Sequence, residues 1–112
     1  MLDFALHRLQ NILKNMNVYP KKMLKNLNIT NGLIFSQRVM LELTKHGFSR
    51  EKAYTLVQKN AQNSWKKNIS FYESLANDSL INKKISNKDL IKMFDLNYHI
   101  KRINVIYKRV FK

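Results

Sequence analysis

The sequence predicts an all-α fold, with one long helix followed by several short ones. The 112 residues include only two Gly and one Pro, which leaves little room for hairpin turns or Gly-rich loops. Apolar residues recur at spacings of three and four nearly everywhere, as they do on one face of a helix. A chain of this length suits one compact unit with a small core.

The first predicted helix covers residues 2–16. Its apolar residues fall on one seam of the a/d type: Leu2, Ala5, Leu6, Leu9, Ile12, Leu13 and Met16. Such a seam is typical of a helix within a bundle. Asn17 and Pro20 end the helix, because proline removes a backbone donor and restricts the residue before it.

Pro20 also suits the first position of the next helix. This short helix runs to about Leu27 and is expected to turn Met23, Leu24 and Leu27 inward.

A third helix is predicted between Thr30 and Gly47. Thr30 can cap its start, and His46 with Gly47 ends it as a glycine C-cap. Its apolar positions are Leu33, Ile34, Val39, Met40, Leu41 and Leu43. Gly32 lies in its first turn, where close packing against a neighbour would explain the missing side chain.

Ser49 predicts the start of a fourth helix, which continues to about Lys67. Serine is a favoured N-cap, and Glu51 suits the positive end of the helix dipole. One face is expected to be buried: Ala53, Leu56, Val57, Asn60, Ala61 and Trp65.

Two further serines mark helix starts in the second half of the chain. Ser70 and Glu73 form a capping box, opening a short helix to Ala76. Ser86 and Asp89 repeat the signal more weakly.

In the remaining segments of the second half, the spacing of apolar residues predicts where helices form. Residues 77–86 are the least regular, and we expect at most a short helical turn there. The last helix is predicted from about Leu96 to Val110, with these residues inward: Tyr98, Ile103, Ile106, Tyr107 and Val110.

The formal net charge of +14 raises the question of a nucleic-acid partner, because clustered cations gain from neutralising phosphates. Most of the 21 basic residues are lysine, however, and they are spread along the whole chain. Arginine is the residue of bidentate phosphate recognition. We therefore favour a solvated basic surface, and a free-standing basic helical module that binds nucleic acid is the alternative.

Other partners and compartments are constrained by what the sequence lacks. It has no Cys, which excludes disulfides and fits a reducing cytosol. No run approaches the about 20 apolar residues of a membrane span, and the first residues do not read as a signal peptide. We expect a soluble cytoplasmic protein that does not bind membranes.

Candidate catalytic or metal-binding residues are scarce. The three His, at 7, 46 and 99, are isolated in the sequence, and only seven acidic residues are present. Phosphate-binding Gly-rich loops and nucleophile elbows are absent from the sequence. We therefore expect no metal, no cofactor and no catalytic residue. The one polar cluster inside an apolar helix is Ser36-Gln37-Arg38, which either faces a ligand or, as we favour, bonds to a neighbouring helix.

Ten segments, spread over nearly the whole chain, form one ordered pattern: Met1-Leu2, His7-Arg8, Asn17 to Leu27, Gly32 to Val39, Ser49 to Tyr54, Val57-Gln58, Asn60-Ala61, Trp65, Phe94 to His99, and Ile106 to Phe111. In their order and spacing these segments resemble the C-terminal region of adenylosuccinate lyase. This family belongs to the fumarase and aspartase superfamily. Two departures are Asn31, where the family often has a second Gly, and the Lys or Asn residues that replace the acids usual after the Ser49 and Ser86 caps.

The resemblance implies a division of the chain and a function. Residues 1–19 resemble the last helix of the central bundle domain, and residues 20–112 resemble the small C-terminal helical domain. The family eliminates fumarate from adenylosuccinate and from succinylaminoimidazole carboxamide ribotide in purine and AMP biosynthesis. Its acid, base and substrate-binding residues lie in earlier regions, so the chain is expected to contribute scaffold and assembly and to be inactive alone.

The expectation about partners rests on the apolar seam of residues 1–16. Without bundle neighbours, each of five large side chains on the seam would lose about 2 kcal/mol of stabilisation by burial. A total near 10 kcal/mol is comparable with the stability of a whole domain, about 5 to 15 kcal/mol. The first helix should therefore self-associate, fold back on the C-terminal domain or fray. Of these outcomes we expect self-association through residues 1–16, or packing on the missing lyase domains, which form a homotetramer in the family.

Overall fold

The computed structural model describes residues 1–111, and its regular elements in that range are all helical, as predicted. They are α1 (Leu2–Lys14), α2 (Pro20–Asn28), the 3-10 helix η1 (Leu33–Phe35), α3 (Ser36–Lys45), α4 (Arg50–Lys67), α5 (Phe71–Ala76), α6 (Ser79–Asn82), α7 (Asn87–Met93), α8 (Asn97–Ile100) and α9 (Ile103–Val110). Within this range no helix is long and apolar enough to cross a membrane.

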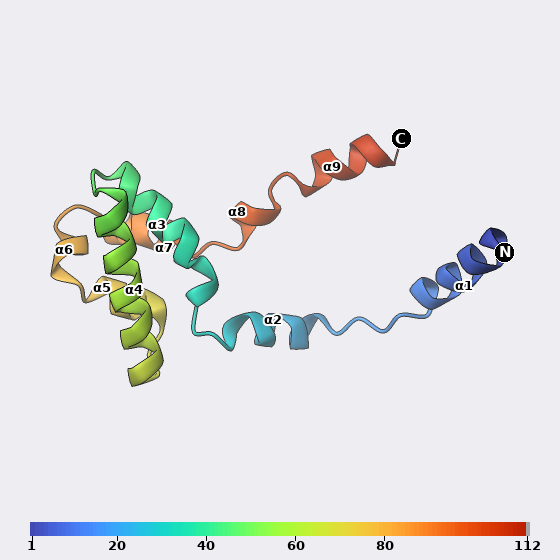
Figure 1. The fold of residues 1–112 in the computed structure, drawn as a ribbon, viewed down its shortest axis with the longest axis horizontal. Coiled ribbons are helices and arrows are strands. Elements are labelled where there is room, and N and C mark those ends of the chain that lie inside the picture. Colours follow the sequence, from blue (N-terminus) through green and yellow to red (C-terminus); the bar gives the residue numbers. More distant parts are fainter. Residues whose placement is uncertain (112) are drawn as a thin grey trace.

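The hydrophobic core lies among η1 and α3 to α7, which we call the core unit (Figure 1). Helix α4 packs against α3 and α5, and α7 packs against the same two helices. The buried core residues are Val39, Leu43, Ala53, Leu56, Val57, Phe71, Leu75, Ile81, Ile85, Leu90 and Met93. Full burial of a large apolar side chain stabilises a fold by about 1.5–3 kcal/mol, so this cluster holds the unit together.

Three serines cap helices of the core unit as predicted: Ser49, Ser70 and Ser86. In each case the backbone N–H three residues later donates a hydrogen bond to the serine Oγ, at 3.0–3.2 Å. These bonds satisfy N–H groups that the first turn of a helix leaves without partners. Helix α3 ends at His46 and Gly47, also as predicted, with Gly47 at φ 83°.

The start of α3 differs from the prediction. Thr30 does not cap a helix, and its Oγ1 is buried without a hydrogen-bond partner. Asn31 and Gly32 both adopt positive φ, at 51° and 87°, and residues in this conformation cannot continue a right-handed helix. Helix α3 therefore begins only at Ser36, after η1. The predicted close packing at Gly32 is confirmed, since an added Cβ would lie 3.3 Å from Phe94 Cε1.

The buried face of α4 is confirmed as far as Asn60, whereas the burial predicted for Trp65 is wrong. Trp65 is 74% exposed, and Ser64 is fully buried in its place. An α-helix turns by about 100° per residue. Counted from Ala53, that rotation leaves Ser64 nearly in line with the buried face and carries Trp65 about 120° away from it.

Helices α1 and α2 form an N-terminal arm, residues 1–28, that extends away from the core unit (Figure 1). Both helices occupy nearly the predicted ranges. The prediction that Met23, Leu24 and Leu27 face inward is wrong for this chain on its own, because they are 59%, 52% and 41% exposed. The other residues of the arm are also exposed.

Helices α8 and α9 form a C-terminal arm, residues 97–111, which follows the core unit in the sequence. The single helix predicted from Leu96 to Val110 is broken at Lys101-Arg102. The residues predicted to face inward are all exposed: Tyr98, Ile103, Ile106, Tyr107 and Val110. A helix without tertiary packing depends on local propensity alone, which is weak for the β-branched and Asn residues here.

The two arms make the molecule elongated. Its principal extents are 60 × 32 × 24 Å and its radius of gyration is 19.5 Å, against about 13 Å for a compact domain of 100 residues. In Figure 1 both arms run from the core unit toward the same end of the picture.

Candidate functional site

The polar cluster singled out in the sequence lies at the start of α3, but its three side chains do not act together. Ser36 and Arg38 are half-buried and Gln37 is exposed. Neighbouring residues of a helix point in directions about 100° apart, so the three cannot converge on one ligand. Arg38 is the member that reaches another element.

Arg38 connects α3 to the beginning of the C-terminal arm. Its Nη1 donates a hydrogen bond to the backbone oxygen of Asp95 at 3.0 Å. Its Cζ lies 3.9 Å from the centre of the Tyr98 ring, in a cation–π contact. Its Nε is buried without a hydrogen-bond partner.

A cleft of about 390 Å³ lies beside this arginine, between α3 and α8. It is lined by Ile34, Gln37, Arg38, Leu41, Glu42, Thr44, Lys45, Tyr98 and His99. Lys45 Nζ is 2.7 Å from Glu42 Oε1, and this hydrogen bond raises the pKa of Lys45. A protonated lysine held by a carboxylate is not available as a base.

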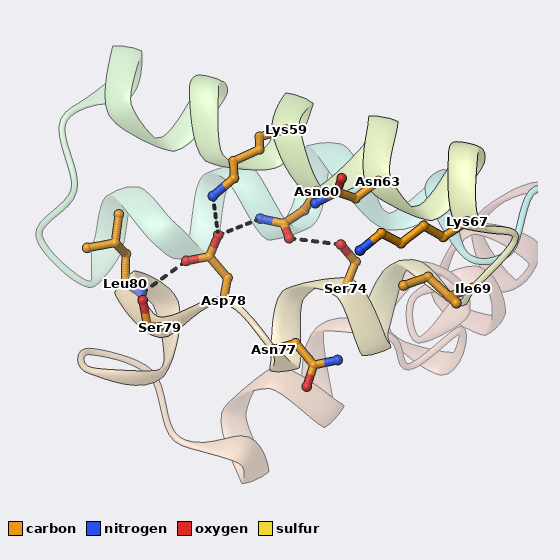
Figure 2. A pocket seen from close by; sticks show the side chains of 10 residues that line it. All are labelled: Lys59, Asn60, Asn63, Lys67, Ile69, Ser74, Asn77, Asp78, Ser79 and Leu80. Atoms are coloured by element: carbon orange, nitrogen blue, oxygen red, sulfur yellow. Dashed lines mark hydrogen bonds and ion pairs between the residues drawn. The ribbon is translucent and has the colours of Figure 1, made fainter.

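A second polar cluster lies inside the core unit, where sequence reasoning did not expect it (Figure 2). Asn60, Ser74 and Asp78 are 2%, 6% and 8% exposed. Asn60 Nδ2 donates to Asp78 Oδ2 at 3.1 Å and to the backbone oxygen of Leu56 at 2.9 Å, while Ser74 Oγ donates to Asn60 Oδ1 at 2.9 Å. The three residues come from α4, from α5 and from the start of α6.

Asp78 is the centre of this network and also caps α6. Its Oδ1 accepts a hydrogen bond from the backbone N–H of Leu80 at 3.0 Å, and Lys59 Nζ lies 3.5 Å from its Oδ2. Burial raises the pKa of Asp78, but the bonds from Asn60 and Leu80 and the charge of Lys59 outweigh burial and lower the pKa overall.

The chemistry available to this second cluster is structural. An ionised carboxylate whose oxygens already accept three partners is a weak base, and the neighbouring Ser74 hydroxyl donates to an amide rather than to a base. Fully satisfied buried networks make a packing arrangement specific. The cluster therefore fixes α4, α5 and α6 relative to one another.

Signals for this network were present in the sequence but are weak. Asn60 falls on the apolar face of α4, and a polar residue at a core position implies a buried partner. Asp78 precedes Ser79 as an N-cap does. Nothing in the sequence, however, pairs residues 18 positions apart.

In the part of the chain that the structure describes, no three His, Cys, Asp or Glu side chains are grouped so that they could hold a metal ion. His46 Nδ1 lies 2.8 Å from the backbone oxygen of Glu42 at the end of α3, and the His99 ring packs 6.2 Å from Phe35. His7 is exposed on α1.

Both arms carry exposed apolar side chains. On α1 the seam residues Leu6, Leu9 and Leu13 are 55%, 52% and 57% exposed. On α9, Ile106 and Val110 are 57% and 68% exposed. Contiguous apolar surfaces of this kind mark interaction sites, so the arms, rather than the clefts, point to the role of the chain.

Comparison with known proteins shows which family this chain resembles. A model of the family described as "Adenylosuccinate lyase C-terminus" matches residues 32–110. The chain is 46% identical to the adenylosuccinate lyase of Helicobacter pylori over 98% of its own length, and 39% identical to that of Bacillus subtilis over 97%. It is 38% identical to the Thermotoga maritima enzyme over 88%.

The match is to one part of these enzymes. The chain spans 27% of the Helicobacter pylori enzyme, 25% of the Bacillus subtilis enzyme and 23% of the Thermotoga maritima enzyme. The family match begins at Gly32, the left-handed glycine that precedes η1, and ends at Val110, the last residue of α9. The resemblance seen in the sequence is thus confirmed, and the chain belongs to the adenylosuccinate lyase C-terminus family.

Proposed function

We propose that this chain provides the C-terminal helical part of an adenylosuccinate lyase. Such an enzyme eliminates fumarate from adenylosuccinate and from succinylaminoimidazole carboxamide ribotide, in the cytoplasmic synthesis of purines. The observation that supports the proposal most strongly is 38–46% identity to three such enzymes over nearly the whole chain. Sequence identity at this level over such a length supports the same fold and the same position within the longer enzyme.

The contribution of the chain is scaffold and assembly, and the chain alone is inactive. The second polar cluster has its bonds satisfied internally, and the cleft beside Arg38 holds Lys45 in a salt bridge with Glu42. Elimination requires a base positioned to remove a proton from the substrate and an acid for the leaving group. We place those groups on the regions of the enzyme that this chain does not contain.

The exposed arms are the surfaces for assembly. The seam of α1 repeats at heptad-like spacing, which suits knobs-into-holes packing with other helices. We assign residues 1–19 to the bundle of the enzyme and residues 20–112 to its small C-terminal domain. The bundle neighbours of α1 come from the remaining lyase domains and from the other subunits of a homotetramer.

A chimeric enzyme tests this proposal. The matching C-terminal quarter of the Bacillus subtilis lyase is replaced by this chain, and fumarate release from adenylosuccinate is measured for the chimera and for the isolated chain. We expect release by the chimera and none by the isolated chain. A folded tetrameric chimera without activity, or measurable release by the pure isolated chain, would contradict the proposal.

Two variants of the chimera test the role of α1. Leu6→Asp with Leu13→Asp places two charges on the seam and should abolish assembly. Gln10→Asp with Asn11→Asp places the same two charges on α1 outside the seam positions named above and should leave assembly intact. Equal behaviour of the two pairs would show that the seam does not mediate assembly.

A further inference from the structure

The C-terminal arm is attached to the core unit over a very short stretch. The Phe94 and His99 rings lie 5.2 and 6.2 Å from the ring of Phe35. Beyond Ile100 every residue that the structure describes is exposed. The direction in which the arm leaves the core unit is therefore set by contacts around residues 94–100.

Arg38 makes the directional contacts within this stretch. Its guanidinium donates to the Asp95 backbone oxygen at 3.0 Å and covers the Tyr98 ring at 3.9 Å. A hydrogen bond weakens steeply when its angle changes, and a cation–π contact requires the cation over the ring face. Packing between aromatic rings such as Phe35 and Phe94 tolerates a wider range of geometries.

The other cation on the Tyr98 ring cannot serve this purpose. Lys101 Nζ lies 4.3 Å from the ring centre, but Lys101 belongs to the arm and moves with it. Arg38 is on α3, whose Val39 and Leu43 are buried in the core. Only a group fixed to the core unit can orient the arm against it.

We propose that Arg38 is a latch that fixes the direction of the C-terminal arm. It holds residues 95–98 by one hydrogen bond and one ring contact, and it leaves α9 free to present its apolar face. Glu42 and Asp89 line a second cleft together with Arg38, but Glu42 is paired with Lys45 and Asp89 with Lys92.

Amide hydrogen exchange of the isolated chain tests the latch. In Arg38→Ala, amides of residues 95–100 should exchange about ten-fold faster, since a charge-assisted hydrogen bond and a cation–π contact are lost together. Amides of α4 and α5 should exchange at the wild-type rate. Amides of α9 should also be unchanged, because α9 is already exposed in the wild-type chain.

Three further variants make the test selective. Arg50→Ala removes an exposed arginine from the start of α4 and should not change exchange in residues 95–100. Arg38→Lys keeps the charge but not the planar fork and should fall between wild type and Arg38→Ala. Tyr98→Leu removes the ring and keeps the hydrogen bond from Arg38 to Asp95. Its exchange rate in residues 95–100 should also fall between wild type and Arg38→Ala.

The outcomes separate the latch from a general effect on stability. Wild-type exchange of residues 95–100 in Arg38→Ala, with the core unit intact, would overturn the proposal. If exchange in α4 and α5 also becomes faster in Arg38→Ala, the substitution has destabilised the core unit. The Tyr98→Leu variant then provides the test. Faster exchange confined to residues 95–100 in Tyr98→Leu would support the latch, and no change there would overturn it.

Discussion

The core unit and the two arms differ in burial far more than in sequence character. Leu43 in α3 is fully buried, whereas Leu6 and Leu9 in α1 are 55% and 52% exposed, although both helices carry apolar residues at the same spacing. Helical periodicity therefore indicates which face of a helix seeks a partner, and only the tertiary structure shows whether the partner belongs to the same chain. We propose that the arms pack against other regions of the whole enzyme.

The largest effect expected from this comparison is in the core unit. Leu43→Ala should lower the free energy of unfolding by about 3 kcal/mol, because it removes buried contacts and leaves a cavity. Urea denaturation followed by circular dichroism measures the change. A loss below about 1 kcal/mol would show that α3 is not packed as described.

A smaller effect is expected at the buried polar network. Asp78→Ala should cost about 2 kcal/mol, since the Leu80 N–H loses its side-chain acceptor and Asn60 Nδ2 keeps only its bond to Leu56. Urea denaturation at neutral pH measures this cost, and Asp3→Ala on exposed α1 is the matched control, with almost no expected loss.

The network also makes stability depend on pH. The folded pKa of Asp78 is lowered from the ordinary value of 3.8, so the unfolded chain binds the proton more tightly. The contribution of Asp78 is complete well above the ordinary pKa of 3.8, and it is lost as the pH falls through that value and then through the folded pKa. The stability difference between the wild type and Asp78→Asn should narrow over that acid range, and a constant difference would exclude this linkage.

The two glycines offer a finer comparison. Gly32→Ala should cost about 1–2 kcal/mol, since it combines a positive φ with a contact to Phe94. Gly47→Ala shares the positive φ but meets only the flexible end of Lys84, at 3.8 Å, and should cost about 1 kcal/mol. Thermal unfolding of both variants checks the order, and a reversed order would argue against the packing at Gly32.

The smallest effect is expected in the N-terminal arm of the isolated chain. Leu9→Ala should change the unfolding free energy of the core unit by less than about 0.5 kcal/mol, because exposed substitutions rarely do more. The comparison with Leu43→Ala uses the same assay. A loss close to that of Leu43→Ala would mean that α1 is packed in solution.

Local signals explain why much of the core unit could be predicted from the sequence. Ser49, Ser70 and Ser86 cap their helices through bonds that span three residues, so short patterns contain the whole interaction. Thr30 shows the limit of this reasoning. It offers a cap signal, but the left-handed Asn31 and Gly32 that follow it start a turn instead.

Interactions between distant residues could not be predicted in this way. The Asn60–Asp78 bond and the Arg38–Asp95 bond join residues 18 and 57 positions apart, and no periodicity specifies such pairs. The polar cluster Ser36-Gln37-Arg38 was therefore visible in the sequence while the partner of Arg38 was not. The break at Lys101-Arg102 and the exposure of α9 likewise depend on neighbours that lie outside the local sequence.

Amide hydrogen exchange of the isolated chain and of the Bacillus subtilis chimera, compared peptide by peptide, tests the central claim most directly. We predict that residues 1–28 and 103–111 exchange rapidly in the isolated chain and at least about 100-fold more slowly in the chimera, where neighbouring domains cover them. The core unit should be protected in both. Arms that are already protected in the isolated chain, or that stay unprotected in an assembled chimera, would contradict the account.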